Sequence, residues 1–379
     1  MSLALTEEQE LLRNTAREFV AENSPVKELR RLRDSNDPVG FSRELWKQMA
    51  ELGWAGIVLP EEYGGADLGY AELGIVLEEC GRTLAATPLV STVLLGANAL
   101  LLAGNGTQQK GVLAAVAKGE TVLALALQES AHHAPYQVAT RAEATRDGYK
   151  LTGKKTFVQD GHVADQIVVV ARSAGRAGER DGLSLFLVPK GARGMRVTRT
   201  WMVDGRNSAQ IELDGVEVDK SAAVGHVGRG ADVLDPVLDR ATIGVAAETL
   251  GTVAEAFDRT IHYLKTRKQF GVPIGSFQAL KHRAAAMFTE VELSRSIVLD
   301  ALRAVDEKRP DVAVLASIAK ARVSDAAHLV GNEAVQMFGG IGVTDEEEIG
   351  LFLKRARVAE LTLGDAAYHR ARFATLNGF

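Results

Sequence analysis

The spacing of apolar residues changes twice along this chain of 379 residues, and these two changes constrain the fold more than any single motif. Apolar residues recur at helical spacing up to about residue 121, as Leu11 and Phe19 illustrate. Short β-rich runs separated by Gly, Pro and Asp-Gly turns follow, and helical spacing then returns. We therefore predict an α+β protein with an N-terminal helical domain (1–121), a central antiparallel β-barrel or sheet domain (122–229) and a C-terminal four-helix bundle (230–379).

Individual elements follow from the same pattern. Thr6 and Gln9 are spaced like a capping box, which predicts a helix start there. A polar break at 33–40 precedes a helix at about 41–52, and Tyr63-Gly64-Gly65 predicts a tight turn with positive φ. The expected strands are 121–127, 149–158, 165–171, 183–188, 195–201 and 210–214, and the expected C-terminal helices are 232–265, 276–306, 310–338 and 345–376.

Composition excludes several classes of protein. The net charge of −5 provides no basic surface for nucleic acid. A single cysteine, Cys80, excludes an intramolecular disulfide framework and indicates a reducing compartment. The first residues lack a basic segment followed by an apolar run, and no apolar stretch reaches the ~20 residues of a spanning helix. We expect a cytoplasmic protein without membrane insertion.

Two glycine-bearing segments at helix ends are candidate binding sites. The segment 263–278 contains Arg267 and Lys268 in the expected last turn of a helix, where basic side chains either complement the carbonyl end of the helix or face a phosphate. The segment 335–344 contains Gln336 and a Gly-Gly-Ile-Gly run, which is also typical of an ordinary helix C-terminus. Local sequence leaves both alternatives open.

Resemblance to a family favours the binding alternative. The pattern Arg-x-Gln-Phe-Gly-x-Pro-Ile-x-x-Phe-Gln at 267–278 resembles the flavin-binding turn of the acyl-CoA dehydrogenase family, and the order of domains is similar over the full length. No Gly-x-Gly-x-x-Gly follows a strand, so a Rossmann unit is absent. The resemblance implies FAD, held across a subunit interface by Arg267, Gln269, Phe270, Ile274, Phe277, Gln278, Gln336, Gly339 and Gly340.

The sheet domain supplies the other expected flavin contacts. Family members carry Thr-Glu-Pro after the first strand, where this chain has Gln128-Glu129-Ser130, so Gln128 stands in for the threonine. Phe157, Val158 and Gln159 match the positions that cover the flavin face, although Phe and Val in a strand are by default core residues. His132 and His133 lack carboxylate support, and we predict no metal site.

Members of the family use a carboxylate base to remove a proton from the substrate, and this chain lacks that base at the family's usual position. The family's C-terminal glutamate matches Leu363, which does not abstract protons, so the chain resembles a bacterial branch that lacks this residue. The candidate replacement is Glu248, on a helix face of small residues, either as the base or as a structural glutamate paired with an arginine or a backbone amide. The resemblance implies a base at the position of Ala241 in some branches and at that of Glu248 in branches with bulky substrates. Asp239 and Glu360 are weaker rivals.

The resemblance implies α,β-dehydrogenation of an acyl-CoA to a trans-2-enoyl-CoA, with a branched or bulky acyl group, in the degradation of fatty acids or steroid side chains. Arg240 is the candidate contact for the CoA phosphates, although the family's arginine matches Thr242. Electron-transfer flavoprotein or a similar acceptor and a homotetramer or α2β2 heterotetramer are the expected partners. Two alternatives are a non-catalytic or half-site partner subunit of a heterotetramer, and a flavin monooxygenase on the same fold.

Overall fold

A computed structural model describes residues 4–379 of the chain, which form two compact units. The helical unit comprises the chain up to Arg31 together with Tyr70–Ala85 and Thr242–Phe379, and the sheet unit comprises Leu32–Gly69 and Ala86–Ala241. Residues 1–3, part of the segment in which no export signal was found, lie outside the described residues. The N-terminal helices are therefore divided between the two units, and the boundaries at 121 and 229 stay predictions.

The N-terminal region is helical, as predicted. Thr6 and Gln9 form the expected capping box, with each side chain accepting from the other residue's backbone amide. The helical stretch before the polar break is divided into two helices, because Pro25 interrupts it. Gly64 has the positive φ of 78° predicted for the Tyr63-Gly64 turn. The helices of this region are α1 (Glu7–Asn23), α2 (Val26–Asp34), α3 (Arg43–Glu51), η1 (Trp54–Gly56), η2 (Glu61–Tyr63), α4 (Tyr70–Arg82), η3 (Val90–Ala97), α5 (Asn98–Ala103), α6 (Gly106–Gln108), η4 (Gln109–Leu113) and α7 (Ala114–Ala117).

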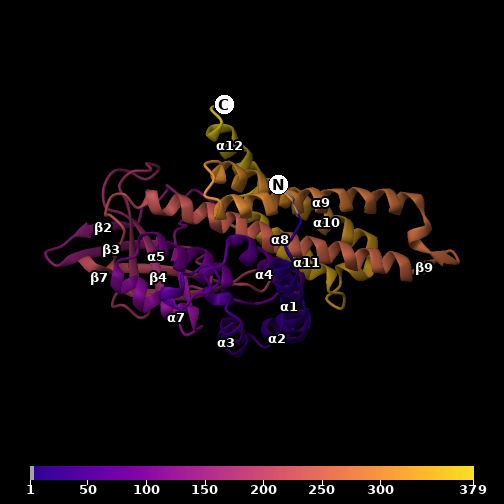
Figure 1. Ribbon diagram of the computed structural model, residues 1–379, viewed down its shortest axis with the longest axis horizontal. Coiled ribbons are helices and arrows are strands. Elements are labelled where there is room, and N and C mark those ends of the chain that lie inside the picture. Colours follow the sequence, from indigo (N-terminus) through magenta and orange to yellow (C-terminus); the bar gives the residue numbers. More distant parts are fainter. Residues whose placement is uncertain (1–3) are drawn as a thin grey trace. The chain divides into compact units, whose positions relative to one another are not determined.

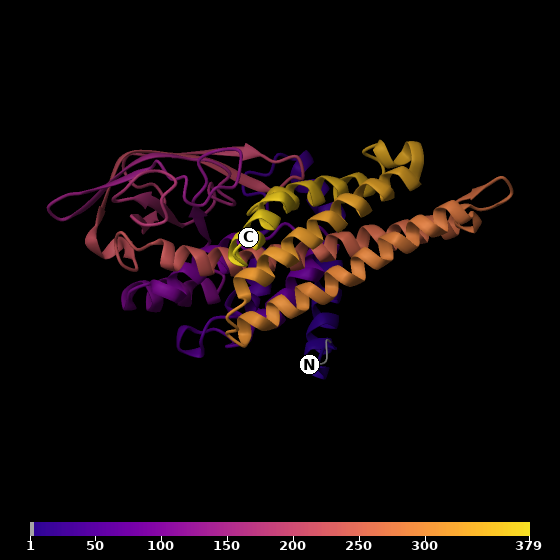
Figure 2. The ribbon, with the colours of Figure 1, turned by 90° about the horizontal axis from the view of Figure 1, so that it is seen from above.

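Long helices dominate the C-terminal part, as predicted. Figures 1 and 2 show α8, α9 and α10 running side by side, with a hairpin at the end that joins α8 to α9. Within the helical unit, α10 packs against α9, α11 and α12. The helices are α8 (Ala231–Thr266), η6 (Ile274–Ser276), α9 (Gln278–Asp306), α10 (Val312–Phe338), η7 (Gly339–Val343), α11 (Ile349–Leu361) and α12 (Ala366–Leu376).

The prediction of one helix over 345–376 is wrong. The chain turns between α11 and α12, where Leu363 and Gly364 have φ of 58° and 101°. Asp365 caps α12 by accepting from the amide of Tyr368 at 2.8 Å. The buried Lys320 of α10 donates to the carbonyls of Glu360 and Gly364, each at 2.8 Å, so the ends of α11 and of the turn are satisfied by a side chain distant in sequence.

Lys320 makes stability depend on pH. Burial lowers the pKa of Lys320 to about 7, against the opposing charges of Glu360 and Asp365. The unfolded chain then holds more protons than the folded chain above about pH 7, so the free energy of unfolding rises with pH there and falls as pH drops. We expect wild type to gain up to about 1.4 kcal/mol per pH unit relative to Lys320→Met between about pH 7 and pH 9, measured by urea unfolding. If the free energy of unfolding changed with pH in the same way in both proteins, the lowered pKa of Lys320 would be contradicted.

The sheet unit contains eight strands in the order β6-β7-β3-β2-β4-β5-β8, with β1 also paired to β4. β4 is buried along nearly its whole length and lies near the middle of this order, whereas β6 is an edge strand with alternating exposure. Figure 1 shows β7, β3 and β2 next to one another. The strands are β1 (Leu123–Ala126), β2 (Arg141–Ala144), β3 (Gly148–Lys155), β4 (Gln166–Arg172), β5 (Leu183–Pro189), β6 (Met195–Trp201), β7 (Asn207–Asp219) and β8 (Ala223–Val224). The short helix η5 (Lys220–Ala222) lies between β7 and β8.

We predicted an antiparallel sheet, but the observed sheet also contains parallel strand pairs. β1 pairs in parallel with β4, Leu123 opposite Gln166, and β2 meets β4 in parallel at one residue pair. A helical crossover does not precede β4, so periodicity gave no signal for the parallel pairing. The strands β2 and β8 were not predicted, because one is polar and the other has two residues. Among residues 4–379, every helix is too short or too polar to cross a membrane.

Candidate functional site

The segment after α8 is a β-hairpin rather than a helical turn. α8 ends at Thr266, so the prediction that Arg267 and Lys268 lie in its last turn is wrong. β9 (Lys268–Gln269) pairs with β10 (Val272–Pro273), and the two residues between them, Phe270 and Gly271, have φ of 54° and 82°. Positive φ at both central residues is typical of a two-residue hairpin turn.

The hairpin offers a cation and an aromatic ring to solvent. Arg267 and Lys268 are exposed, and neither forms an ion pair with any residue in the described part of the chain. Phe270 is 91% exposed, and its ring lies edge-on to that of Phe277 with centroids 6.1 Å apart. A bare guanidinium beside exposed aromatic rings is the chemistry that a phosphate-bearing aromatic ligand requires.

The second glycine segment lies beside the first. Tyr263, in the last turn of α8, stacks on Phe338 at the end of α10 with ring centroids 4.3 Å apart, and its hydroxyl donates to the carbonyl of Phe338 at 3.4 Å. Gln336 is exposed, and within residues 4–379 no heavy atom beyond the glycine and its chain neighbours lies within 4 Å of a Cβ built on Gly339 or Gly340. One chain therefore brings these two predicted segments together, with open backbone at the glycines.

The predicted residues of the sheet unit also gather in one place. The amide of Thr156 donates to the carbonyl of Gln128 at 2.8 Å. Phe157 has a φ of 51° and is 46% exposed, so it is not a core residue, whereas Val158 is buried and exchanges backbone hydrogen bonds with Ala209. Gln159 is half-buried. A strained and exposed aromatic residue next to a buried anchor is consistent with a ligand-facing role for Phe157.

A buried ion pair that sequence inspection missed fixes the loop after β1. Lys155 donates to Glu129 at 2.7 Å and to the carbonyl of Leu127 at 3.1 Å, and Glu129 also accepts from the amides of Ala139 and Thr140. Burial lowers the pKa of Lys155 to about 8. Burial opposes ionisation of Glu129 too, but Lys155 and the two amides outweigh it and hold its pKa below the usual value. Gln128 is thus attached to an ordered loop.

Glu248 is a buried carboxylate on α8. Residues 241–254 are all buried, and Glu248, 5% exposed, is the only ionisable side chain among them. The predicted small-residue face is present, with Gly244, Gly251 and Thr252 buried beside it. A carboxylate in such a position is costly to bury and therefore a candidate functional group.

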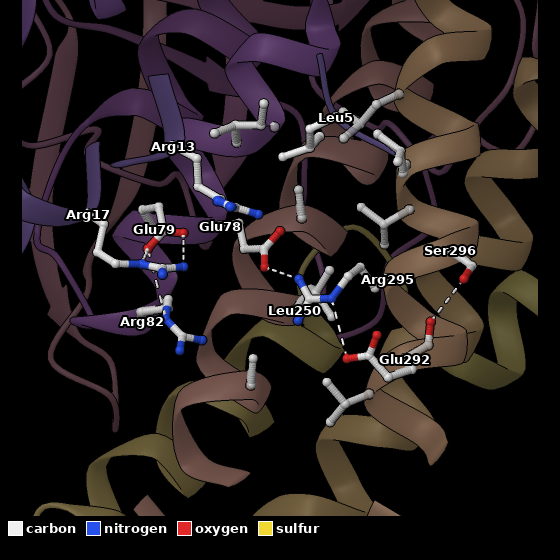
Figure 3. A pocket seen from close by; sticks show the side chains of 18 of the residues that line it. Leu5, Arg13, Arg17, Glu78, Glu79, Arg82, Leu250, Glu292, Arg295 and Ser296 are labelled. Atoms are coloured by element: carbon white, nitrogen blue, oxygen red, sulfur yellow. Dashed lines mark hydrogen bonds and ion pairs between the residues drawn. The ribbon is translucent and has the colours of Figure 1, made fainter. Parts of the chain in front are cut away.

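A cavity of about 610 Å³ lies on another face of α8, within the helical unit (Figure 3). Ala247, Leu250 and Ala254 line it, but Glu248 does not. Its charged wall consists of mutually paired groups, and the dashed lines in Figure 3 mark the pairs of Arg295 with Glu78 and of Arg17 with Glu79. Five carboxylates and four arginines line the cavity, so its wall is close to neutral.

Glu360 and Arg240, two of the other candidate residues, have side-chain partners. Glu360 pairs with Arg357, and Arg240 donates to the side chain of Asn98 at 2.8 Å. Asp239 is buried, next to Arg240 in the chain. Leu363 is half-buried, and its carbonyl lies 2.9 Å from the Nε2 of His369. The turn that carries Leu363 is therefore well ordered but has no ionisable side chain at that position.

Comparison with known proteins identifies the class. The descriptions "Acyl-CoA dehydrogenase, N-terminal domain", "middle domain" and "C-terminal domain" match residues 6–120, 125–216 and 228–375. The chain is 31% identical over 377 residues to the probable acyl-CoA dehydrogenase YngJ of Bacillus subtilis (strain 168), with 98% of each covered. Together the fold and these matches define a flavoprotein oxidoreductase with helical, sheet and helical domains.

Solved structures agree with this class. Butyryl-CoA dehydrogenase from Megasphaera elsdenii has a TM-score of 0.90 and 27% identity, with 100% of both chains covered. A chain of the ChsE4–ChsE5 complex from Mycobacterium tuberculosis has a TM-score of 0.90 and 29% identity over the same coverage. The chain belongs to the acyl-CoA dehydrogenase family, whose members are oxidoreductases that act on acyl-CoA.

Proposed function

We propose that this chain binds FAD and removes hydrogen from the α and β carbons of a branched or bulky acyl-CoA, with Glu248 as the base. The single observation that carries the proposal is the burial of Glu248 as the only ionisable side chain in residues 241–254 of α8. Leu363 leaves the reaction without its usual carboxylate, and a base near the α carbon is indispensable. A base on α8, instead of one on the α11–α12 turn, favours a branched or bulky acyl group over a straight one.

The residues present fit FAD. Arg267 supplies an exposed guanidinium for a pyrophosphate, and Gly339 and Gly340 leave room for close backbone approach. Gln269, Phe270, Ile274, Phe277, Gln278 and Gln336 would complete this half of the site, and Gln128, Phe157, Val158 and Gln159 would contact the isoalloxazine end. We propose that two subunits build each site, in a homotetramer or an α2β2 heterotetramer.

The chain's own residues would bind, orient and deprotonate the substrate. Glu248 would take the proton from the α carbon onto a carboxylate oxygen, inside a stretch of helix that excludes water. The chemistry that FAD supplies when bound is acceptance of the hydride from the β carbon. Arg240, whose guanidinium donates to the side chain of Asn98, would meet a CoA phosphate. Electrons would then pass to an electron-transfer flavoprotein or a similar acceptor.

A second candidate is a partner subunit that completes another chain's site. The ordered turn with Leu363 in place of a carboxylate favours it, and one similar structure is a complex of two named proteins, ChsE4 and ChsE5. Such a chain would bind little FAD alone and would show no turnover.

Purification of the chain alone separates the two candidates. We expect a bound flavin spectrum, a native mass of a multiple of the 40.6 kDa chain, and reduction of a ferricenium acceptor with branched or ring-bearing acyl-CoA substrates. Flavin-free protein without turnover would contradict the enzyme proposal and favour the partner subunit. Turnover that needs oxygen would instead indicate a monooxygenase.

A further inference from the structure

The helices α4 and α8 meet backbone to backbone at two glycines. A Cβ built on Gly81 would lie 1.9 Å from the carbonyl oxygen of Glu248, and one built on Gly251 would lie 1.8 Å from that of Glu78. The hydroxyl of Thr252 donates across the contact to the carbonyl of Gly81 at 3.1 Å. Because the opposing atoms are backbone, neither helix accepts a side chain here unless one of them moves.

The contact is reciprocal. Each glycine lies on the carbonyl of a glutamate that precedes the other glycine by three residues, so Glu78-x-x-Gly81 on α4 faces Glu248-x-x-Gly251 on α8. We call these two four-residue segments the glycine crossing. The crossing includes the backbone of Glu248 itself, so it determines the position of that residue along α8.

Helix α4 is held from its other sides. The Glu78 side chain pairs with Arg295 of α9. Glu79, almost fully buried, accepts two hydrogen bonds from Arg17 of α1, at 3.0 and 2.8 Å, and Figure 3 shows both ion pairs. Since these pairs anchor α4 to two other helices, a side chain added at the crossing would displace α8.

We propose that Gly81 and Gly251 are positioning residues that hold Glu248 at the reacting carbon. The proposal rests on the function proposed above, in which Glu248 is the base. A displacement of about 1 Å at a reacting group costs on the order of 100-fold in rate, and an added methyl group at a contact of this kind forces a shift of that order. Glycine at these two positions is thus a requirement of catalysis as well as of packing.

The test compares alanine at the crossing with alanine at another buried glycine of α4. Gly81→Ala and Gly251→Ala should lower turnover about 100-fold and move the pH at which turnover is half-maximal. The matched control is Gly74→Ala on α4, whose added Cβ would meet the flexible side chain of Leu302 instead of backbone. Gly74→Ala should lower stability while leaving the pH profile unchanged.

Cys80 provides a readout that does not depend on catalysis. It is the only cysteine of the chain, is 1% exposed and adjoins Gly81. Alkylation by iodoacetamide should be slow in wild type and in Gly74→Ala, and at least about tenfold faster where the crossing is forced open, because access then depends on separation of the helices.

The outcomes distinguish failure of the positioning role from failure of Glu248 as the base. Faster alkylation with unchanged turnover and pH profile would overturn the positioning role, and unchanged alkylation with unchanged turnover would show that the crossing accepts alanine and overturn it too. If the alanine variants do not fold, Thr252→Val, which removes the bridging hydroxyl, should lower turnover and Thr252→Ser should restore it. Full turnover in Glu248→Gln would refute the proposed base, whereas the alkylation rates would still report whether the crossing holds α8.

Discussion

Glu248→Gln should lower turnover by about 10²–10⁴-fold, the contribution typical of a positioned general base. The amide keeps the shape and burial of the side chain but accepts no proton. Bound flavin should remain at the wild-type level, since Glu248 is not among the residues proposed to hold FAD. The measurements are ferricenium reduction with a panel of acyl-CoA substrates and exchange of the substrate's α hydrogen in deuterated buffer.

Glu255→Gln is the matched control for this variant. Glu255 lies two turns further along α8 but is partly exposed, and it pairs with Arg259 at 2.9 Å and with Arg82 at 3.6 Å. Loss of a partly exposed pair changes stability by about 1 kcal/mol or less and should leave turnover unchanged. Equal turnover of Glu248→Gln and Glu255→Gln would remove Glu248 from the mechanism.

Arg267→Met should weaken FAD binding by about 10- to 100-fold. Methionine keeps an aliphatic side chain but loses the charge-assisted hydrogen bonds to a phosphate, which contribute about 1.5–3 kcal/mol. The melting temperature of the apoprotein should not change, because Arg267 is exposed and forms no ion pair with the described residues. Titration of apoprotein with FAD, followed by flavin fluorescence, measures the effect.

Lys265→Met tests whether general charge explains such a loss. Lys265 is exposed in the last turn of α8, two residues before Arg267. It carries the same charge as Arg267 but lies outside the hairpin. We expect FAD affinity within about twofold of wild type for this control. An equal loss in both variants would mean that the hairpin attracts FAD only through net charge, and that Arg267 makes no specific contact.

The order of helical and strand regions was predictable because the spacing of apolar residues is a local property of the sequence. Helical and strand spacing located the three regions and most of the strands, and the capping box at Thr6 was correct. The turn at Leu363 was not predictable, since Lys320 and His369 stabilise it from positions distant in the sequence or in the next helix. The same reason explains the missed parallel pairing of β1 with β4.

The candidate site divides in a similar way. The hairpin and the glycine segment are contiguous motifs, so sequence located them, although it did not predict the positive φ of Phe270. The stacking of Tyr263 on Phe338 joins residues 75 positions apart, and Gly81 is further still from Glu248. A signal for the glycine crossing does exist in the sequence, in the repeated Glu-x-x-Gly spacing, but nothing local indicates that the two copies meet.

The uninterrupted length of α8 has an evolutionary consequence. One rigid helix separates Glu248 from Arg267 by roughly 28 Å along its axis, at 1.5 Å per residue. If the hairpin serves a neighbour's cofactor, as we propose, then each chain contributes its base and its phosphate contact to different sites. After gene duplication, one copy is free to lose the base and the other to lose the hairpin, and selection would then retain the two copies only as an obligate pair.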